Sequence, residues 1–448
     1  MQRHEYAAFK RCLEYYIADP DFRAKMDRDP TQAVSLLNYK ALLAPQAAAA
    51  ALKAILFGTL PPDGFRNPYL QAYAGHYGAV EAYVSRTLTE DRFYSRELYR
   101  FGELVRSRCR MENAEIERHS AIRYFPLAFE LTEGCRVQCS FCGFSAPPFR
   151  GCFPWNEENA RLWEAVLRAA KGFIGPAAGT APCYFATEPL DHPDYEKFLG
   201  TMEQVFGTVP QTTTAAADRE PERFRSLLSR IGSERLQAQA SVRVSVRSLR
   251  QFQKIMETFS EDELAYVELL CNNKESINRV SDSGRSRKND GIAAEKRFSY
   301  SICCIAGFLV SMPRKELRLI EPELPDEEFP LGYRVRAVRS FADGEEFLRA
   351  LEELTAEYAR SSLPEDLALA WNKNIQIEPE EEGKLRFYGG GRISHVRDGQ
   401  LMRGLIQCVK EGCTFSRAAE KLELSGTARA AAYRCLQELY LRGYLRLL

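Results

Sequence analysis

The sequence predicts an α/β protein whose central domain is a partial parallel barrel, preceded by a helical domain and followed by a small helical module. Three observations support this prediction. The first quarter of the chain is Ala-rich with helical spacing, the middle alternates short apolar runs with helical stretches, and the C-terminal end returns to helical spacing. We expect a helical domain over 1–118, a barrel over 119–325, an α+β segment over 326–397 and a helix-turn-helix or winged-helix-like module over 398–448.

Length and composition exclude several classes of protein. The chain has 448 residues, its 61 Lys and Arg balance its 61 Asp and Glu, and 45% of its residues are hydrophobic, which excludes a disordered or polycationic chain. The longest apolar stretch, 41–57, contains Pro45, Gln46 and Lys53 and is shorter than the roughly 20 apolar residues of a bilayer span. The N-terminus lacks a secretory pattern. We therefore expect a cytoplasmic protein with no membrane partner.

The N-terminal domain has clear helix boundaries. Asp19-Pro20 and Asp29-Pro30 each join a capping residue to a proline, a pair typical of a helix start. The stretch from Asp19 to Pro30 also resembles helical segments of nitrile-hydratase-like and Nif11-like leader peptides. This region is therefore predicted to be either part of a leader-binding site or a plain helical cap on the barrel.

The barrel prediction depends on six apolar runs separated by helical stretches. The runs end before turn residues or polar loops, and helices are expected from about Asn156, Pro193, Pro221 and Ser248. The predicted strands are 124–131, 182–186, 209–215, 241–246, 265–270 and 301–310. Between the last two strands, 281–297 is polar, basic and rich in turn residues, which predicts a mobile loop that could act as a lid.

The two C-terminal segments differ in pattern. The first predicts a strand over 333–338, a helix over 343–360 and a hairpin over 385–396 that turns at glycines. The second predicts three helices, over 401–410, 416–422 and 427–442, with Gly412 and Gly426 at the breaks.

Three cysteines lie close together on the loop that follows the first predicted strand. Cys135, Cys139 and Cys142 occur in GCRVQCSFCGF, with three and then two residues between them. Three such thiolates can ligate three irons of a [4Fe-4S] cluster and leave the fourth iron open to another ligand. A structural zinc site is the alternative, but it needs a fourth ligand, and the only nearby candidate, Cys152, follows ten residues later. The pattern favours the cluster.

This loop resembles that of the radical SAM superfamily, whose CxxxCxxC motif follows the first strand of a partial (β/α)6 barrel. An aromatic residue precedes the third cysteine in that motif, as Phe141 does here. The resemblance implies that the open iron binds S-adenosylmethionine as a co-substrate. It also implies that one-electron reduction releases a 5'-deoxyadenosyl radical, while the protein orients the target hydrogen.

Other residues match superfamily positions that contact S-adenosylmethionine. Ala186-Thr187-Glu188-Pro189 stands where many members have Gly-Gly-Glu-Pro, so only the Glu-Pro half agrees with that pattern. The resemblance implies that Glu188 and the neighbouring backbone bind the ammonium group. Contacts to the ribose and carboxylate are predicted for residues that could equally be polar side chains at the barrel rim: Thr213, Thr214, Arg243 and Ser245.

Longer stretches resemble the radical SAM peptide epimerases of the proteusin type, which mature ribosomally synthesised peptides. The similarity covers roughly 120–340, and its most characteristic blocks are 183–198, 209–228 and 304–312. It implies conversion of L-residues to D-residues in a leader-bearing precursor. The expected partners are that precursor and an external electron donor of the flavodoxin or ferredoxin type.

Epimerisation requires a hydrogen donor on the face opposite the abstracted hydrogen. Members of this family use a cysteine thiol, so we expect a further cysteine in the barrel lumen. Cys303 and Cys304 are adjacent on a predicted strand and must face opposite sides. Cys304 is preferred because it begins the family-like CxxGF, Cys303 is second and Cys271 is third. Each could instead be an ordinary buried cysteine.

Two other functions remain open. Thioether formation or another peptide modification is the enzymatic alternative, although only Cys408, Cys413 and Cys435 follow residue 304, which disfavours an auxiliary cluster. The non-enzymatic alternative is an iron-sulfur DNA-binding regulator. From residue 398 onward there are eight Lys or Arg against five Asp or Glu, a balance less basic than strong DNA-binding modules have. A packing module or a site for the leader peptide is preferred.

Overall fold

The computed structural model describes residues 1–448 except 38–41, 43, 60–62, 113–123, 240 and 360–361. The predicted boundary between the helical domain and the barrel, at 118/119, lies outside the described residues. Within the described ranges, no helix is both long enough and apolar enough to cross a bilayer.

The N-terminal helices begin where the capping residues predict. The Asp19 side chain accepts hydrogen bonds from the backbone N–H groups of Asp21 and Phe22, and Asp29 caps the next helix in the same way. Proline follows each cap at the first helical position, which confirms the two predicted breaks. The helices are α1 (Arg3–Ala18), α2 (Pro20–Arg28), α3 (Pro30–Leu36), α4 (Pro45–Phe57), α5 (Pro68–Thr87) and α6 (Arg96–Glu112).

One sheet contains four strands in the order β1-β9-β10-β11. Strand β1 (Phe125–Glu130) runs parallel to β9 (Ile305–Ser311), whereas β10 (Glu316–Pro322) and β11 (Tyr333–Ser340) continue the sheet in antiparallel fashion. The predicted division of the chain at residue 325 lies between β10 and β11, so this sheet includes strands from both predicted segments.

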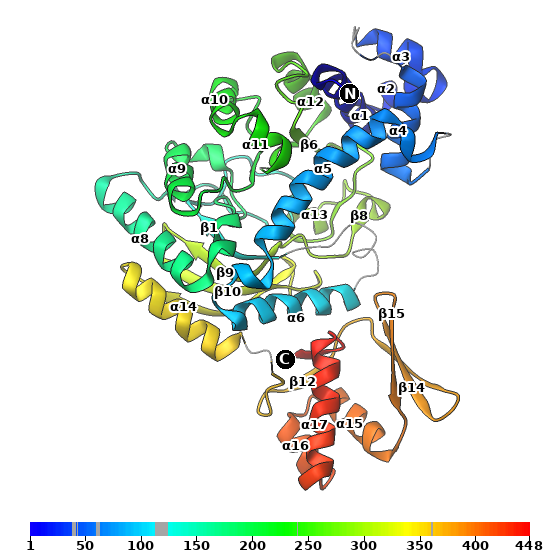
Figure 1. Ribbon diagram of the computed structural model, residues 1–448, viewed down its shortest axis with the longest axis vertical. Coiled ribbons are helices and arrows are strands. Elements are labelled where there is room, and N and C mark those ends of the chain that lie inside the picture. Colours follow the sequence, from blue (N-terminus) through cyan, green and yellow to red (C-terminus); the bar gives the residue numbers. More distant parts are fainter. Residues whose placement is uncertain (38–41, 43, 60–62, 113–123, 240, 360–361) are drawn as a thin grey trace.

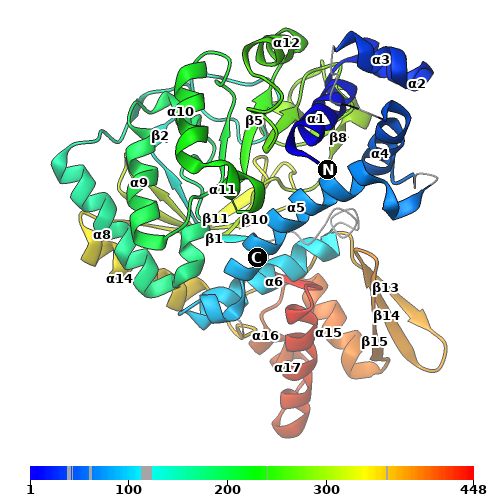
Figure 2. The ribbon, with the colours of Figure 1, turned by 45° about the horizontal axis from the view of Figure 1, so that its top comes forward.

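A second sheet is wholly parallel and contains β4 (Thr212–Thr214), β5 (Val242–Val246) and β6 (Val267–Cys271). Alternate residues of β5 and β6 are buried, as a sheet covered by helices on one face requires. The covering helices are α10 (Pro221–Ile231), α11 (Ser233–Ala238) and α12 (Leu249–Thr258), which lie beside these strands in Figures 1 and 2.

The prediction of a strand over 182–186 is wrong. This segment lies beside β1, since the N–H of Phe129 donates to the Pro182 oxygen (2.8 Å) and the N–H of Phe185 donates to the Phe129 oxygen (3.1 Å). Pro182 and Phe185, which both bond to Phe129, are separated by two residues, whereas a regular parallel ladder has one residue between such partners. Ala186 has a φ of 55°, which ends the extended conformation. The strands at the predicted barrel positions are therefore divided between two sheets, and the structure does not show the predicted barrel as one continuous sheet.

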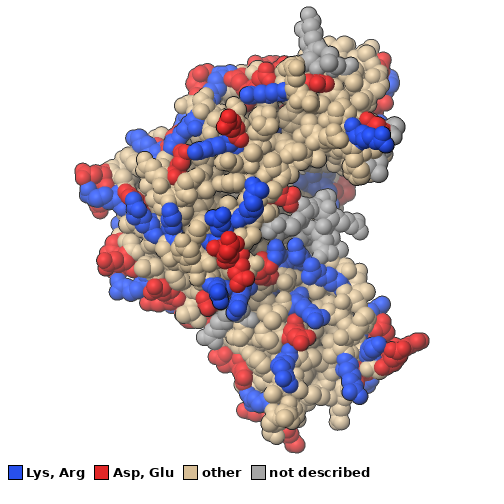
Figure 3. All heavy atoms as spheres, viewed as in Figure 1, with Lys and Arg blue, Asp and Glu red and all other residues tan. Residues whose placement is uncertain are grey.

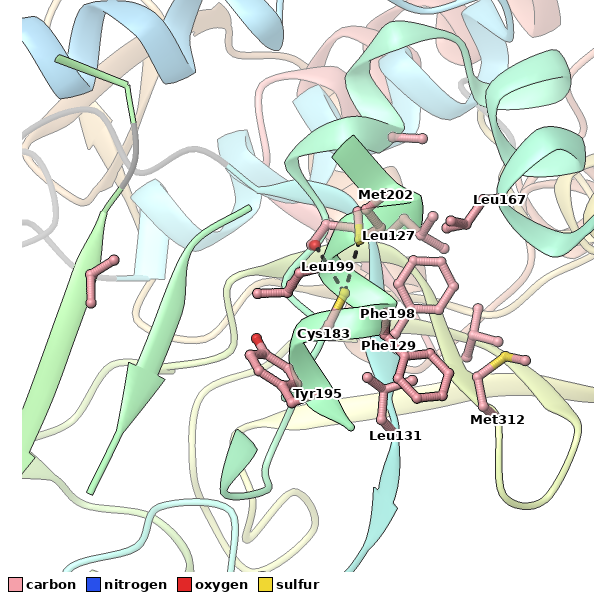
Figure 4. Close-up of a cluster of buried hydrophobic side chains, with 14 of the residues drawn as sticks. Leu127, Phe129, Leu131, Leu167, Cys183, Tyr195, Phe198, Leu199, Met202 and Met312 are labelled. Carbon is pink, nitrogen blue, oxygen red and sulfur yellow. Dashed lines mark hydrogen bonds between the residues drawn. The ribbon is translucent and has the colours of Figure 1, made fainter. Parts of the chain in front are cut away.

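The largest hydrophobic core joins β1 to the helices that follow it. Figure 4 shows Leu127 and Phe129 of β1, and Leu131 directly after it, against Phe198 and Met202 of α9. The covering helices are α8 (Glu157–Ile174), α9 (Tyr195–Phe206) and α14 (Gly344–Tyr358). Their apolar faces confirm the helices that the sequence predicts there.

The C-terminal module lies beyond α6, at the lower end of the view in Figure 1. The hairpin predicted in the preceding segment and the three predicted helices are confirmed, a third strand extends the hairpin, and the hairpin shares one hydrophobic core with the helices, so it belongs to this module. The elements are β12 (Leu369–Trp371), β13 (Gln376–Glu380), β14 (Lys384–Gly389), β15 (Arg392–Arg397), α15 (Gln400–Lys410), α16 (Phe415–Lys421), α17 (Gly426–Leu441) and β16 (Leu445–Leu447).

A buried ionic network connects α6 to β10, β11 and the C-terminal end. The Arg108 guanidinium lies 3.0 Å from Glu321 and 3.5 Å from Glu323, and Arg334 contacts both of these carboxylates. Arg334 also lies 3.3 Å from the Leu447 backbone oxygen, to which it donates a hydrogen bond. All of these charged side chains are mostly or fully buried. Each therefore depends on its ionic partners to compensate for the hydration that it loses on burial.

Replacing Arg108 with alanine is expected to lower the free energy of unfolding by about 3–5 kcal/mol, because it leaves Glu321 and Glu323 buried with too few cations. Chemical denaturation at neutral pH measures this. Arg100→Ala is the matched control, because Arg100 is exposed on the same helix; it should change stability by less than about 0.5 kcal/mol. Equal effects of the two substitutions would show that the network does not stabilise the fold.

The same network predicts a dependence on pH. Burial by itself raises the pKa of Glu321, but the surrounding guanidinium groups, Arg108 first, lower it to about 2. A carboxyl group whose folded pKa is depressed stabilises the fold above its unfolded pKa, and this stabilisation is lost as the pH falls toward the folded pKa. The stability difference between wild type and Glu321→Gln should therefore shrink as the pH falls from about 4.5 toward 2.

Candidate functional site

The cysteine loop is closed at its base by two short strands. Strand β2 (Thr132–Glu133) pairs with β3 (Gly151–Cys152), and the Cys135 N–H donates to the Pro147 oxygen (2.9 Å). Gly134 has a φ of 81°, and a Cβ there would lie 2.2 Å from the Pro148 oxygen. Only glycine fits this turn, which directs the following cysteines back toward the strand ends.

The structure brings the three predicted ligands together. Cys135, Cys139 and Cys142 pack around one small apolar cluster that also contains Ala215, the residue after β4. All three are free thiols. Among the described residues, no three His, Cys, Asp or Glu side chains converge as ligands of a single metal ion.

Burial disfavours the thiolate form of two of the three cysteines. Burial raises the pKa of Cys139 to about 12, the nearby Arg247 lowers it, and the Cys142 and Cys135 thiols raise it further. Burial also raises the pKa of Cys135. Metal binding requires thiolates, so these cysteines must lose their protons when iron binds.

The chemistry of this donor set fits a [4Fe-4S] cluster bound through three irons. Three free thiols lie on one loop around a common apolar contact, and Cys152, the fourth ligand of the zinc alternative, lies on β3 outside this cluster of side chains. Cys135, Cys139 and Cys142 are the residues that would hold such a cluster.

Glu188 lies next to the cysteine cluster and is buried. One carboxylate oxygen accepts hydrogen bonds from the Thr214 hydroxyl (2.5 Å) and the Leu190 N–H (3.1 Å), and the other accepts from the Ala215 N–H (2.7 Å). Burial raises the pKa of Glu188 to about 7, although these three donors lower it. Thr214 therefore holds Glu188 in place at the end of β4.

The segment before Glu188 has a backbone suited to glycine. Ala186 occupies the left-handed region with a φ of 55°, at the position where the resembling enzymes have glycine. The Thr187 N–H donates to the Tyr184 oxygen (3.0 Å), and the buried Pro189 begins the short 3-10 helix Pro189–Asp191. This turn aims Glu188 toward the cysteine loop despite the missing glycines.

The partly exposed faces of β4 and β5 carry connected polar side chains. Arg243 donates from Nε to the Thr213 hydroxyl (3.0 Å), and its Nη2 lies 3.4 Å from the Tyr184 hydroxyl. Tyr184 also contacts the Thr213 hydroxyl (2.9 Å) and accepts from Gln211 (2.7 Å). Ser245, on the same face, lies 3.5 Å from the Asn272 amide. Thr213, Arg243 and Ser245 thus share one face.

The three candidate hydrogen donors occupy different environments. Cys304 is partly exposed, burial raises its pKa, and the nearby Arg243 lowers it. Cys303 is 2% exposed, and its Sγ lies 3.6 Å from the Ile305 oxygen within a hydrophobic cluster. Cys271 is fully buried on the face of β6 opposite to Glu268, where the nearest charged groups are Glu14 and Lys10 of α1. Only Cys304 combines accessibility with proximity to the Arg243 face.

Several residues at this site were not predicted from the sequence. Asp191 accepts from the Arg136 N–H (2.7 Å) on the cysteine loop, and Arg247 lies near Cys139. Arg247 could have been found by continuing the alternation from Arg243 and Ser245, whereas Asp191 follows Glu188 in a turn that has no periodic pattern. Phe141, which lies between Cys139 and Cys142 in the sequence, is half-buried.

No protein-family model matches the chain. The uncharacterized protein y4wI of Sinorhizobium fredii (strain NBRC 101917 / NGR234) is 33% identical over 340 residues, which is 74% of this chain and 62% of that protein. The chain therefore spans about three fifths of the length of this relative.

One solved structure has a detectable similarity to the chain. The crystal structure of BtrN in complex with AdoMet and 2-DOIA has a TM-score of 0.32 and 15% sequence identity, over 52% of this chain and 87% of that chain. A TM-score this low does not establish a shared fold.

Proposed function

We propose that this protein is a radical SAM enzyme that converts L-residues to D-residues in a ribosomally synthesised, leader-bearing peptide. The observation that carries the proposal is the meeting of three free thiols from one loop with Glu188 at the end of β4. The thiols and Glu188 come from two separate stretches of the chain, and Thr214 and Ala215 at the end of β4 bind Glu188 from a third. Carboxyl ends of parallel strands are where α/β proteins commonly bind ligands.

In this proposal Cys135, Cys139 and Cys142 hold a [4Fe-4S] cluster, and the Glu188 region binds S-adenosylmethionine. When bound and reduced, this pair supplies a 5'-deoxyadenosyl radical, which removes the α-hydrogen of the target residue. Thr213, Arg243 and Ser245 are candidate contacts for the co-substrate. The partial barrel belongs to the same proposal and is supported by the parallel pairings β1-β9 and β4-β5-β6.

An accessible cysteine that could donate a hydrogen atom, Cys304, supports epimerisation over other peptide modifications. Cys304 would transfer the hydrogen atom of its S–H bond to the planar α-carbon, which forms a new C–H bond and leaves a thiyl radical. One electron from an external reductant and one proton would then restore the thiol. The accessibility of Cys304 and its position near Arg243 support this role.

The C-terminal module is proposed to bind the leader of the precursor peptide. Its three helices and three-stranded sheet leave β15 as an edge strand in the described structure, and an edge can pair with an extended peptide. Figure 3 shows Lys and Arg interspersed with Asp and Glu on the face in view, without a large basic patch. A mixed surface of this kind suits a peptide better than DNA.

Anaerobic co-expression with a leader-bearing precursor, followed by hydrolysis and chiral amino-acid analysis, tests the proposal. D-residues should accumulate only when the enzyme is present. A product with cross-linked residues and no D-residues would instead favour the thioether alternative. Purified protein that binds zinc, or that never cleaves S-adenosylmethionine under a strong reductant, would exclude the radical SAM class itself.

A further inference from the structure

The 281–297 segment, predicted from its composition to be a mobile loop, is folded against the cysteine loop. It contains β7 (Val280–Ser281), α13 (Gly284–Arg287) and β8 (Arg297–Phe298), and β7 pairs with β8. The Gly284 N–H donates to the Pro330 oxygen (2.7 Å). This segment is therefore attached on both sides, to the cysteine loop and to the segment after β10.

The contact between the two segments requires glycine at residue 284. Gly284 has a φ of 55°, and a Cβ there would lie 2.4 Å from the Gly143 oxygen and 2.7 Å from the Cys142 oxygen. Two backbones therefore meet directly, without side chains between them. This close approach places the next residue, Arg285, over the middle of the cysteine loop.

Arg285 makes four hydrogen bonds to that loop. Its backbone N–H donates to the Cys142 oxygen (2.9 Å), and Nε donates to the Cys139 oxygen (3.0 Å). Its Nη1 donates to the Ala146 oxygen (2.7 Å) and to the Gln138 side-chain oxygen (2.9 Å). One rigid planar guanidinium thus fixes several loop groups at once, which a lysine cannot do.

Gln138 extends this set of contacts to the first cysteine. Its amide nitrogen donates to the Cys135 oxygen (2.6 Å), the Ala146 oxygen (3.1 Å) and the Pro147 oxygen (2.9 Å). Gln138 and Ser145 both have positive φ values, 50° and 49°, which non-glycine residues adopt only when the surroundings hold them. The loop conformation therefore depends on side-chain hydrogen bonds from Arg285 and Gln138.

We propose that Arg285 is a positioning residue that holds Cys139 and Cys142 in the ligating arrangement and places a permanent positive charge beside the bound cluster. The first part concerns the loop itself and stands without any cofactor. The second part rests on the proposed function. A nearby cation and hydrogen bonds stabilise the more negative, reduced state of an iron-sulfur cluster and raise its reduction potential.

The first experiment uses the metal-free protein and does not depend on the proposed function. Iodoacetamide labelling followed by peptide mapping measures the alkylation rates of Cys139 and Cys142 in wild type, Arg285→Ala, Arg285→Lys and Lys288→Ala. Arg285→Ala should react about tenfold faster, the change expected for loss of one charged hydrogen bond. Lys288→Ala is the matched control, because Lys288 is an exposed cation directly after α13.

Arg285→Lys keeps the charge but not the fork of donors, so its alkylation rates should lie between those of wild type and Arg285→Ala. It also remains informative if Arg285→Ala does not fold. Wild-type rates in both Arg285 variants, or equal acceleration in Lys288→Ala, would overturn the positioning role.

The second experiment measures the reduction potential of the anaerobically reconstituted cluster by a redox titration followed by EPR. Arg285→Ala should have a more negative midpoint than wild type, Arg285→Lys should recover part of the difference, and Lys288→Ala should match wild type. An unchanged midpoint in Arg285→Ala refutes the electrostatic part alone. If wild type assembles no cluster, the proposed function fails, while the alkylation result still decides the positioning role.

Discussion

Cys142→Ala is expected to abolish iron-sulfur cluster assembly and S-adenosylmethionine cleavage, because it removes one of the three thiols that the loop brings together. Two remaining thiolates cannot hold three irons of a cluster. The visible absorbance and iron content of the anaerobically reconstituted protein, together with the yield of 5'-deoxyadenosine under a strong reductant, measure the effect. Both should fall to background.

Cys152→Ala is the matched control for this experiment. Cys152 is the next cysteine along the chain and belongs to the same loop, but it lies on β3, where its backbone pairs with Thr132. It should keep wild-type iron content and cleavage. If Cys152→Ala also loses its metal, and the metal is zinc, the zinc alternative is correct.

Cys304→Ala is expected to separate cleavage from epimerisation. The variant keeps the cysteine loop and Glu188, so S-adenosylmethionine is still cleaved and the α-hydrogen still abstracted. No thiol near Arg243 then returns a hydrogen atom, and no D-residue forms. Chiral analysis of the peptide and quantification of 5'-deoxyadenosine, on the same samples, measure the two outcomes.

Cys303→Ala provides the comparison, since Cys303 is adjacent in sequence but fully buried, whereas Cys304 is partly exposed. It should retain epimerisation, with a loss of stability of about 1–3 kcal/mol from the buried cavity. Wild-type turnover in deuterium oxide should place one deuterium at each inverted α-carbon, because the thiol proton exchanges with solvent. Unlabelled D-products, or normal epimerisation by Cys304→Ala, would falsify the assignment of Cys304.

Much of the local structure could be predicted from the sequence. Asp19 and Asp29 start helices because their side chains accept N–H groups that have no partner within the helix, and this depends on neighbouring residues only. The alternation of Val242, Val244 and Val246 identifies a strand with one buried face, and this pattern too depends only on residues close in sequence. The cysteine spacing likewise identifies a candidate ligand set without any structure.

The errors arose where distant segments decide the conformation. The 182–186 segment has an apolar pattern, but its hydrogen bonds with Phe129 are irregular and Ala186 turns away from the extended conformation. The 281–297 segment has the composition of a mobile loop, but the carbonyl groups that Arg285 binds lie about 140 residues earlier in the chain. No periodicity within either segment contains this information.

By itself, the sequence determined the helices, most strands and the identity of the three cysteines, because caps, alternation and spacing act between residues a few positions apart. Only the tertiary structure decided that Cys303 and Cys304 precede β9 instead of lying on it, that Cys304 lies near Arg243, and that Glu188 lies beside the cysteine loop. It also revealed that Arg285 holds that loop. These features depend on contacts between segments far apart in the chain, and such contacts form only when the strands and helices pack together.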